Sequence, residues 1–107
     1  MQFQNILQFD KARWMMAKRL TIEGRVQGVG YRASFADQAL ALGLAGWVRN
    51  RRDGAVEACI DGDATAIETI ILWARRGPPA ALVRNVTIED AGELLLSDGS
   101  FKILATQ

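Results

Sequence analysis

A central Asp-Gly pair, Asp53-Gly54, constrains the fold of this chain more than any other feature of its sequence. The pair separates two strand-like runs, residues 44–50 and 55–61. In the second run apolar and polar residues alternate, which is the pattern of a strand with one buried face. Asp and Gly tolerate the positive φ angles of a tight turn, so their position between two such runs is a strong hairpin signal. The sequence therefore predicts an antiparallel β-hairpin in the middle of the chain.

Helical patterns flank this hairpin on both sides. Before it, apolar residues recur at steps of three and four opposite a polar face, and they predict a helix that ends near Gly43. After it, Asp63 is a suitable N-cap and Gly77-Pro78-Pro79 is a strong stop signal. The apolar positions are Tyr31, Phe35, Ala36, Ala39 and Leu40 in the first helix and Ile67, Ile70, Ile71 and Ala74 in the second.

Three further strands complete the pattern. Leu20 and Ile22 alternate with polar residues, residues 82–89 form another strand-like run, and Phe101 and Ile103 mark a short last strand. The order is β-α-β-β-α-β with a short extra C-terminal strand. It predicts the α+β, ferredoxin-like split β-α-β sandwich, in which an antiparallel sheet carries two helices on one face. This fold hosts many functions, so it does not decide the chemistry.

The length of the chain fits one domain. It has 107 residues, of which 50% are hydrophobic, enough for a single core. Residues 18–107 carry the patterns above and are expected to form this domain. Residues 1–17 show no sustained period and lack the features of a signal peptide, so we expect a flexible N-terminal extension. No apolar run approaches the ~20 residues of a membrane-spanning helix.

Composition narrows the chemistry further. The chain has no histidine and one cysteine, Cys59, which excludes imidazole catalysis and His- or Cys-rich metal sites. We expect no metal and no cofactor. A lone cysteine cannot form an internal disulfide, which fits a reducing cytosol and a cytoplasmic location. The net charge of +1 gives no bias toward nucleic acid or a membrane surface.

A glycine-rich nonapeptide, Gly24–Arg32, lies between the first predicted strand and the first predicted helix; it reads Gly-Arg-Val-Gln-Gly-Val-Gly-Tyr-Arg. Such a turn leaves backbone N–H groups unpaired at the positive end of the helix dipole. Arg32 adds a permanent, fork-shaped cation in the first helical turn. Together these groups suit a phosphate or a similar small oxyanion. The simpler alternative is a tight turn with a solvated arginine.

Three other interpretations of this part of the sequence are weaker. Residues 28–33 match the G-x-G-x-x-A form of the dinucleotide fingerprint, and Asp53 follows at a suitable distance, but it lies in a hairpin turn and the chain is too short for a doubly wound domain. A Walker loop would need a Gly-Lys-Ser/Thr that is absent here. RNA binding on the sheet would need exposed aromatics. The outer face of the third strand offers none, only Glu57, Cys59 and Asp61, and the basic cluster nearby is Arg49, Arg51 and Arg52.

Several motifs in this order resemble the acylphosphatases. They are the nonapeptide Gly24–Arg32, Gly46-Trp-Val-Arg-Asn50, Asp53-Gly54, the terminator Gly77-Pro78-Pro79 and the closing Phe101-Lys102-Ile103. The resemblance covers about residues 18–104, essentially the whole predicted domain. Tyr31 departs from it, because phenylalanine is common at this position in the family. The ring should still pack at the helix start.

The resemblance implies an enzyme that hydrolyses the carboxyl–phosphate bond of acyl phosphates without a metal. By position, Arg32 matches the phosphate-binding arginine of the family and Asn50 its water-positioning asparagine. The backbone amides that match the phosphate cradle are those of Gln27, Gly28, Val29, Gly30, Tyr31 and Arg32. Residue chemistry agrees, because a guanidinium can bind two phosphoryl oxygens in parallel and an amide can both donate to and accept from a water.

The partner that this resemblance implies is a small-molecule acyl phosphate, with phosphate or sulfate also able to occupy the loop. We expect no nucleic acid partner, no membrane partner and a monomer. Two alternatives stay open. One is a non-catalytic small-anion-binding or regulatory ferredoxin-like module, which would keep the loop without turnover. The other is an acylphosphatase-like domain serving carbamoyl transfer, against which the small stand-alone chain argues.

Overall fold

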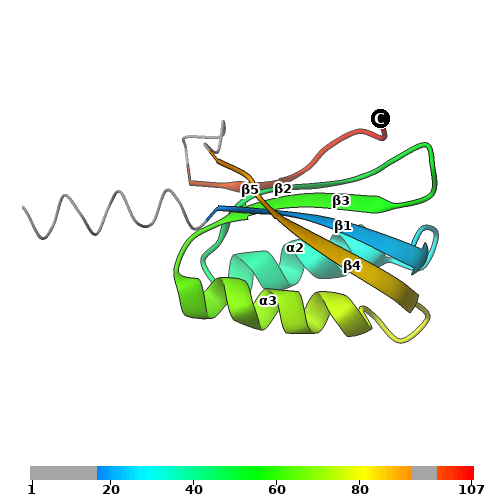
Figure 1. The fold of residues 1–107 in the computed structure, drawn as a ribbon, viewed down its shortest axis with the longest axis horizontal. Coiled ribbons are helices and arrows are strands. Elements are labelled where there is room, and N and C mark those ends of the chain that lie inside the picture. Colours follow the sequence, from blue (N-terminus) through cyan, green and yellow to red (C-terminus); the bar gives the residue numbers. More distant parts are fainter. Residues whose placement is uncertain (1–16, 93–98) are drawn as a thin grey trace, which may run out of the picture.

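The computed structural model describes residues 17–92 and 99–107. These residues form one layer of sheet with two helices packed on one of its faces (Figure 1). The predicted ferredoxin-like fold is confirmed. The elements are β1 (Lys18–Arg25), α2 (Tyr31–Ala41), β2 (Ala45–Asn50), β3 (Val56–Asp61), α3 (Ala64–Arg76), β4 (Leu82–Asp90) and β5 (Phe101–Ile103).

The sheet has the strand order β4-β1-β3-β2-β5. The first four strands in this order pair antiparallel, and the β2–β3 pair is the predicted hairpin. The predicted antiparallel sheet differs at one edge, where the short extra C-terminal strand, β5, pairs parallel with β2. Phe101 lies 5.8 Å from Phe35 between ring centroids, so its burial against α2 holds β5 at this edge. The sheet is therefore mixed.

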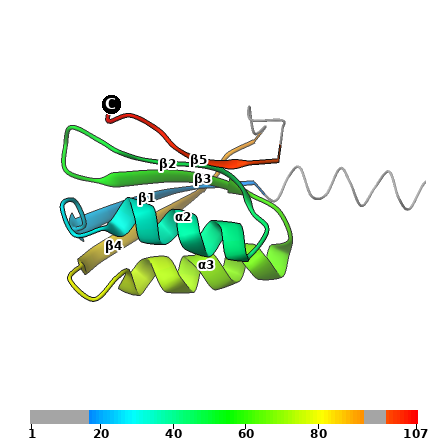
Figure 2. The same ribbon diagram turned by 180° about the vertical axis from the view of Figure 1, so that it is seen from behind.

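The core lies between the sheet and the two helices, which run side by side (Figure 2). Alternate residues of the three central strands point into it, as the sequence predicts. Leu40 is the exception among the predicted apolar positions of α2, because its side chain is 62% exposed. Successive helical residues are rotated by about 100°, and Leu40 falls outside the buried face that contains Phe35 and Ala39. The fully buried core residues include Leu20, Ile22, Tyr31, Phe35, Val48, Val56, Ile60 and Ile70.

The helices end where the sequence predicts. Leu42 caps the C-terminal end of α2, and the next residue, Gly43, has a φ of 70°. The Leu44 N–H then donates to the carbonyl oxygen of Ala39 at 2.9 Å. Asp63 occupies the N-cap of α3, although its side chain makes no capping hydrogen bond there. Gly77 closes α3 with a φ of 68°.

The face of the sheet away from the helices is polar but densely covered. Glu57 is buried there, and its carboxylate pairs with Arg49 at 2.9 Å. The Arg49 guanidinium also lies 4.7 Å from the centre of the Trp47 ring. Cys59 pairs with Trp47 in the sheet and is 4% exposed. Burial raises the pKa of the Cys59 thiol, so its surroundings suit a structural role better than a nucleophilic one.

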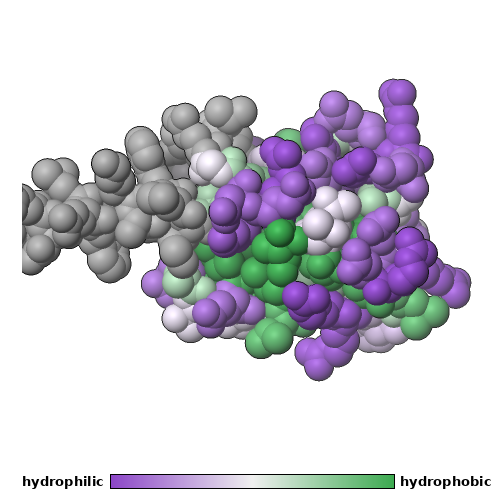
Figure 3. Space-filling view, viewed as in Figure 1, coloured by the Kyte–Doolittle hydropathy of each residue, from purple (hydrophilic) through white to green (hydrophobic). Residues whose placement is uncertain are grey.

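On the face that Figure 3 shows, polar side chains cover most of the surface, and apolar surface is visible mainly between β4 and α3. No helix in the described part of the chain is long and apolar enough to cross a membrane. The predicted N-terminal extension, residues 1–17, lies outside the described residues except for Ala17. Ala17 is buried, and its carbonyl oxygen accepts a hydrogen bond from the Ala91 N–H at 3.0 Å.

Candidate active site

The sheet topology brings two predicted site segments to the same edge. β1 and β2 each run antiparallel to the strand between them, β3, so they are parallel to each other and end on the same side. The end of β1 leads through residues 26–30 into α2, and β2 ends at Asn50. The glycine-rich loop and Asn50 are therefore neighbours although about twenty residues separate them in the chain.

A cavity of about 220 Å³ opens between these segments. It brings together the two predicted catalytic residues, Arg32 and Asn50. Of the predicted phosphate-binding residues, Gln27 and Val29 are not part of its lining. The cavity is lined by Val26, Gly28, Gly30, Tyr31, Arg32, Ala33, Asn50 and Ile103.

The glycines of the loop are required by backbone conformation. Gly28 has a φ of 74° and Gly30 a φ of 80°, in the left-handed region that other residues rarely adopt. A Cβ at either position would meet no atom within 4 Å. Conformation and not crowding therefore selects glycine here, and the space beside the loop stays open to a ligand.

The N-terminus of α2 is open toward this space. Gly30 occupies the N-cap, no side chain makes a capping hydrogen bond, and the first turn contains no acidic residue. The first intrahelical bond is donated by the Ser34 N–H to the carbonyl oxygen of Gly30 at 3.1 Å. The N–H groups before Ser34 have no intrahelical acceptor, and the helix dipole places partial positive charge there. This end of α2 is suited to an anion.

Arg32 adds a full positive charge to the cavity wall. Its side chain is half-buried, and within residues 17–92 and 99–107 no ion pair joins it to a carboxylate. Two arginines of the hairpin differ in this respect, because Arg49 pairs with Glu57 and Arg51 with Asp53. An uncompensated guanidinium beside free backbone N–H groups favours a phosphoryl group with two or three charged oxygens.

Asn50 is held by its backbone on both sides. It pairs with Val56 across the hairpin, and its carbonyl oxygen accepts a hydrogen bond from the Gln107 N–H at 3.1 Å. The C-terminal residues thus continue along β2 beyond β5. With its backbone fixed in this way, Asn50 lines the cavity. A side-chain amide can both donate to and accept from a small molecule such as water.

Sequence reasoning missed three residues that line the cavity: Val26, Ala33 and Ile103. Only Ile103 had a usable signal, because it alternates with Lys102 in a strand whose other inward residue, Phe101, is apolar. It also missed the role of the Gln27 side chain. The Gln27 Nε2 donates to the carbonyl oxygens of Arg51 at 2.7 Å and Ala55 at 2.9 Å.

Tyr31 closes the inner wall of the cavity as a structural residue. Its hydroxyl donates a 2.8 Å hydrogen bond to the carbonyl oxygen of Ala74, and its ring packs against Phe35 and Trp73. Burial raises the pKa of the Tyr31 phenol above its usual range. The phenol therefore stays neutral at physiological pH and contributes neither charge nor a proton to the cavity.

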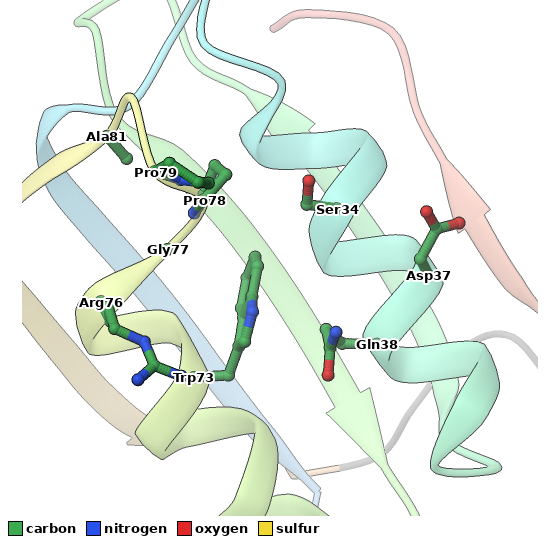
Figure 4. A pocket seen from close by; sticks show the side chains of 9 residues that line it. All are labelled: Ser34, Asp37, Gln38, Trp73, Arg76, Gly77, Pro78, Pro79 and Ala81. Carbon is green, nitrogen blue, oxygen red and sulfur yellow. The ribbon is translucent and has the colours of Figure 1, made fainter.

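A second groove, of about 480 Å³, lies between α2 and α3 near the Gly77-Pro78-Pro79 loop (Figure 4). Ser34 and Gln38 from α2 face Trp73 from α3 across it, and Asp37 points away from the indole ring (Figure 4). The groove lacks the loop N–H groups and Arg32. Its lining contains one acidic and one basic residue, Asp37 and Arg76, whose charges offset each other. The smaller cavity is therefore the candidate active site.

Metal ligands are scarce in the described part of the chain. It contains no group of three or more His, Cys, Asp or Glu residues that could hold a metal ion.

The sequence matches the family model named acylphosphatase over residues 18–103. The chain belongs to the acylphosphatase family. An acylphosphatase of Azoarcus sp. (strain BH72) is 54% identical over 82 residues, which cover 77% of this chain and 84% of that protein. The crystal structure of the Bacillus subtilis acylphosphatase aligns with a TM-score of 0.77 and 33% identity, covering 82% of this chain and 97% of that one.

An acylphosphatase of Coxiella burnetii gives the same agreement, with a TM-score of 0.77, 35% identity, and coverage of 82% of this chain and 90% of that one. Relatives of about half-identical sequence share the name and most of their length with this chain. Membership of the acylphosphatase family identifies the chain as an enzyme that hydrolyses acyl phosphates.

Proposed function

We propose that the cavity between the loop and β2 is the site of acyl phosphate hydrolysis, with Arg32 and Asn50 in separate roles. One observation carries this proposal: Arg32, which is half-buried, and Asn50 come from different elements and line one cavity at the open N-terminus of α2. Arg32 binds two phosphoryl oxygens in parallel. The backbone N–H groups of residues 27–32 receive the remaining negative charge.

Asn50 positions the attacking water. Its amide oxygen accepts a hydrogen from the water while its NH₂ group can donate to the water or to a phosphoryl oxygen. An amide is too weak a base to remove a proton, so its contribution is orientation. The proposal therefore separates binding, by the loop and Arg32, from delivery of the nucleophile, by Asn50.

The reaction needs no metal in this proposal. The water oxygen bonds to phosphorus, the bond between phosphorus and the acyl oxygen breaks, and the electron pair leaves with the carboxylate. A proton of the water passes to a phosphoryl oxygen of the substrate. Because a carboxylate is a good leaving group, orientation and stabilisation of charge by Arg32 and the N–H groups are sufficient.

We also infer a monomer in the cytoplasm. Arg32, Asn50 and the loop N–H groups supply every role in the proposed reaction, so the chemistry needs no residue from a second copy. Cys59, the only cysteine of the sequence, is a free and buried thiol, which suits a reducing compartment.

The test is release of phosphate from acetyl phosphate and benzoyl phosphate by the purified chain, with and without a chelator. We expect turnover in both conditions. Arg32→Ala should abolish most of it and weaken inhibition by inorganic phosphate, whereas Arg75→Ala, which removes an exposed arginine from the last turn of α3, should leave it unchanged. Near-normal hydrolysis by Arg32→Ala would contradict the site.

A further inference from the structure

The side chain of Gln27 connects the two halves of the cavity wall. Its Nε2 donates both of its hydrogens to the turn of the β2–β3 hairpin, one to the Arg51 carbonyl at 2.7 Å and one to the Ala55 carbonyl at 2.9 Å. Gln27 directly precedes Gly28 of the loop, and Arg51 directly follows Asn50. One amide group therefore joins the loop to the segment that carries Asn50.

The turn that Gln27 contacts is itself well defined. The Arg51 N–H donates to the Ala55 carbonyl at 2.8 Å, and the Gly54 N–H donates to the Arg51 carbonyl at 3.1 Å. The Ala55 N–H donates to Asp53 Oδ1 at 3.0 Å. Because these bonds fix the turn internally, holding its two carbonyls also holds the turn as a unit, together with Asn50 at its start.

Backbone pairing does not supply this connection. Pairing between β1 and β3 ends at Ile22 and Val56, and beyond that point β1 pairs only with β4. In the described part of the chain, the backbone bonds outside helices and strands include none between residues 26–30 and residues 51–55. Past the last β1–β3 pair, the Gln27 amide is thus the hydrogen-bonded link between loop and hairpin.

We propose that Gln27 is a positioning residue that sets the placement of Asn50 relative to the bound phosphoryl group. This inference rests on the proposed function, in which the loop binds phosphate and Asn50 orients the water. Gln27 contacts the substrate at most through its backbone N–H, which no side-chain substitution removes. The side chain acts on the reaction through Asn50.

Loss of the Gln27 side-chain bonds should reduce turnover more than binding. The loop, Arg32 and the N-terminus of α2 belong to one continuous segment and keep their own geometry. Asn50 belongs to the other segment, and a displacement of about 1 Å between nucleophile and phosphorus can cost about 10²-fold in rate. Gln27→Met, which keeps the length of the side chain without its donors, should lower kcat about 10- to 100-fold while the inhibition constant for inorganic phosphate changes less than threefold.

Gln38→Met is the matched control, because Gln38 is a half-buried glutamine that lines the second groove on α2. It should retain the wild-type kcat. Thermal unfolding of both variants separates loss of fold from loss of alignment. A Gln27→Met variant that is folded and has a wild-type kcat would overturn the inference and leave the proposed function standing.

A double-mutant cycle with Asn50→Ala tests the route of the effect. If Gln27 acts through Asn50, the double variant should be no slower than Asn50→Ala alone within about twofold. If the kcat losses of the two single variants multiply in the double variant, the inference is overturned, because Gln27 would then act independently of Asn50. A wild-type kcat for Asn50→Ala would instead contradict the proposed function, so the two failures are distinguishable.

The pH dependence of kcat in Gln27→Glu is a measurement that a purely structural role of Gln27 would not change. Its ionised carboxylate would face two carbonyl oxygens, whereas its protonated form can donate one hydrogen bond to them. The kcat of this variant relative to Gln27→Met should therefore rise several-fold as pH falls through the pKa of the introduced carboxyl. Parallel pH profiles for the two variants would overturn the inference.

Discussion

The hydroxyl of Tyr31 donates a buried hydrogen bond of 2.8 Å to the carbonyl oxygen of Ala74, in the last turn of α3. Tyr31 is also the first residue of α2 and lines the candidate active site. This single bond therefore ties the N-terminus of α2, where phosphate is proposed to bind, to the C-terminus of α3. It also gives the tyrosine a function that a phenylalanine at this position could not provide.

Tyr31→Phe should lower stability without impairing hydrolysis. The substitution leaves the buried carbonyl of Ala74 without this donor, which costs about 1–2 kcal/mol. Because the ring remains in place against Trp73, kcat and KM should stay within about twofold of wild type. Urea unfolding and acetyl phosphate kinetics check the two parts, and a large loss of kcat would mean that the hydroxyl takes part in the reaction.

The stability difference between Tyr31 and Tyr31→Phe should depend on pH in one direction. Burial raises the pKa of the folded phenol above the unfolded value of about 10. The contribution of Tyr31 is therefore complete below about pH 10 and is lost as pH rises toward the folded pKa, because only the unfolded phenol ionises there. Urea unfolding of both proteins at pH 8 and pH 10.5 should show the difference shrinking, and a constant difference would contradict the burial argument.

Gly30→Ala should weaken phosphate binding specifically. A φ of 80° costs an alanine about 1–2 kcal/mol, and relief of this strain would turn the N–H groups of the loop away from the cavity. Gly43→Ala is the matched control, since Gly43 has a φ of 70° and, like Gly30, open space around a Cβ. Both variants should lose similar stability, but only Gly30→Ala should raise the inhibition constant of inorganic phosphate, by about tenfold. An equal rise of the inhibition constant in both variants would mean that weaker phosphate binding results from lower stability.

The sequence predicts that Arg32 and Asn50 lie close together, because the topology of the fold brings them to the same edge of the sheet. β1 leads through the loop to Arg32 at the start of α2, and the parallel strand β2 ends at Asn50, in a fold that the alternating patterns and the Asp53-Gly54 turn specify. Their meeting in one cavity needs no detail of side-chain packing. The buried stripe of α3 is predictable for a similar reason, since it follows from helical periodicity.

Other features could not be predicted because their partners carry no sequence signal. The Gln27 side chain bonds to backbone carbonyls, which every residue has, so no motif marks Arg51 or Ala55 as its acceptors. The parallel direction of β5 also escaped prediction, because three residues contain no pattern that fixes a direction. Leu40 shows the limit of periodicity, since it lies one position beyond the face that the sheet covers.

Asn50→Ala should lower kcat far more than it lowers phosphate affinity. Its amide is proposed to hold the water, whereas the loop N–H groups and Arg32 hold the phosphoryl group. We expect a kcat loss of about 10²- to 10³-fold, with the inhibition constant of inorganic phosphate within about threefold of wild type. Steady-state kinetics with phosphate as a competitive inhibitor measure both. Equal losses in the two quantities would identify Asn50 as a direct phosphate ligand.

Ile103→Ala should change the preference between acyl groups. Ile103 lines the cavity and is 49% exposed, so it offers apolar surface to the part of the substrate that extends beyond the phosphoryl group. The substitution removes a contact in which the substrate would bury about half of the isoleucine side chain. This loss costs about 1 kcal/mol, or about fivefold in kcat/KM. The loss should appear with benzoyl phosphate and be nearly absent with acetyl phosphate, whose methyl group is too small to cover Ile103.

Leu40→Ala is the control for this comparison, because Leu40 is an exposed apolar residue on α2 that does not line the cavity. It should leave the ratio of kcat/KM for the two substrates unchanged. The decisive quantity is this ratio, since a general loss of stability or of phosphate binding would lower both rates together. If Ile103→Ala lowers both equally, the acyl group must leave the cavity on a side that Ile103 does not border.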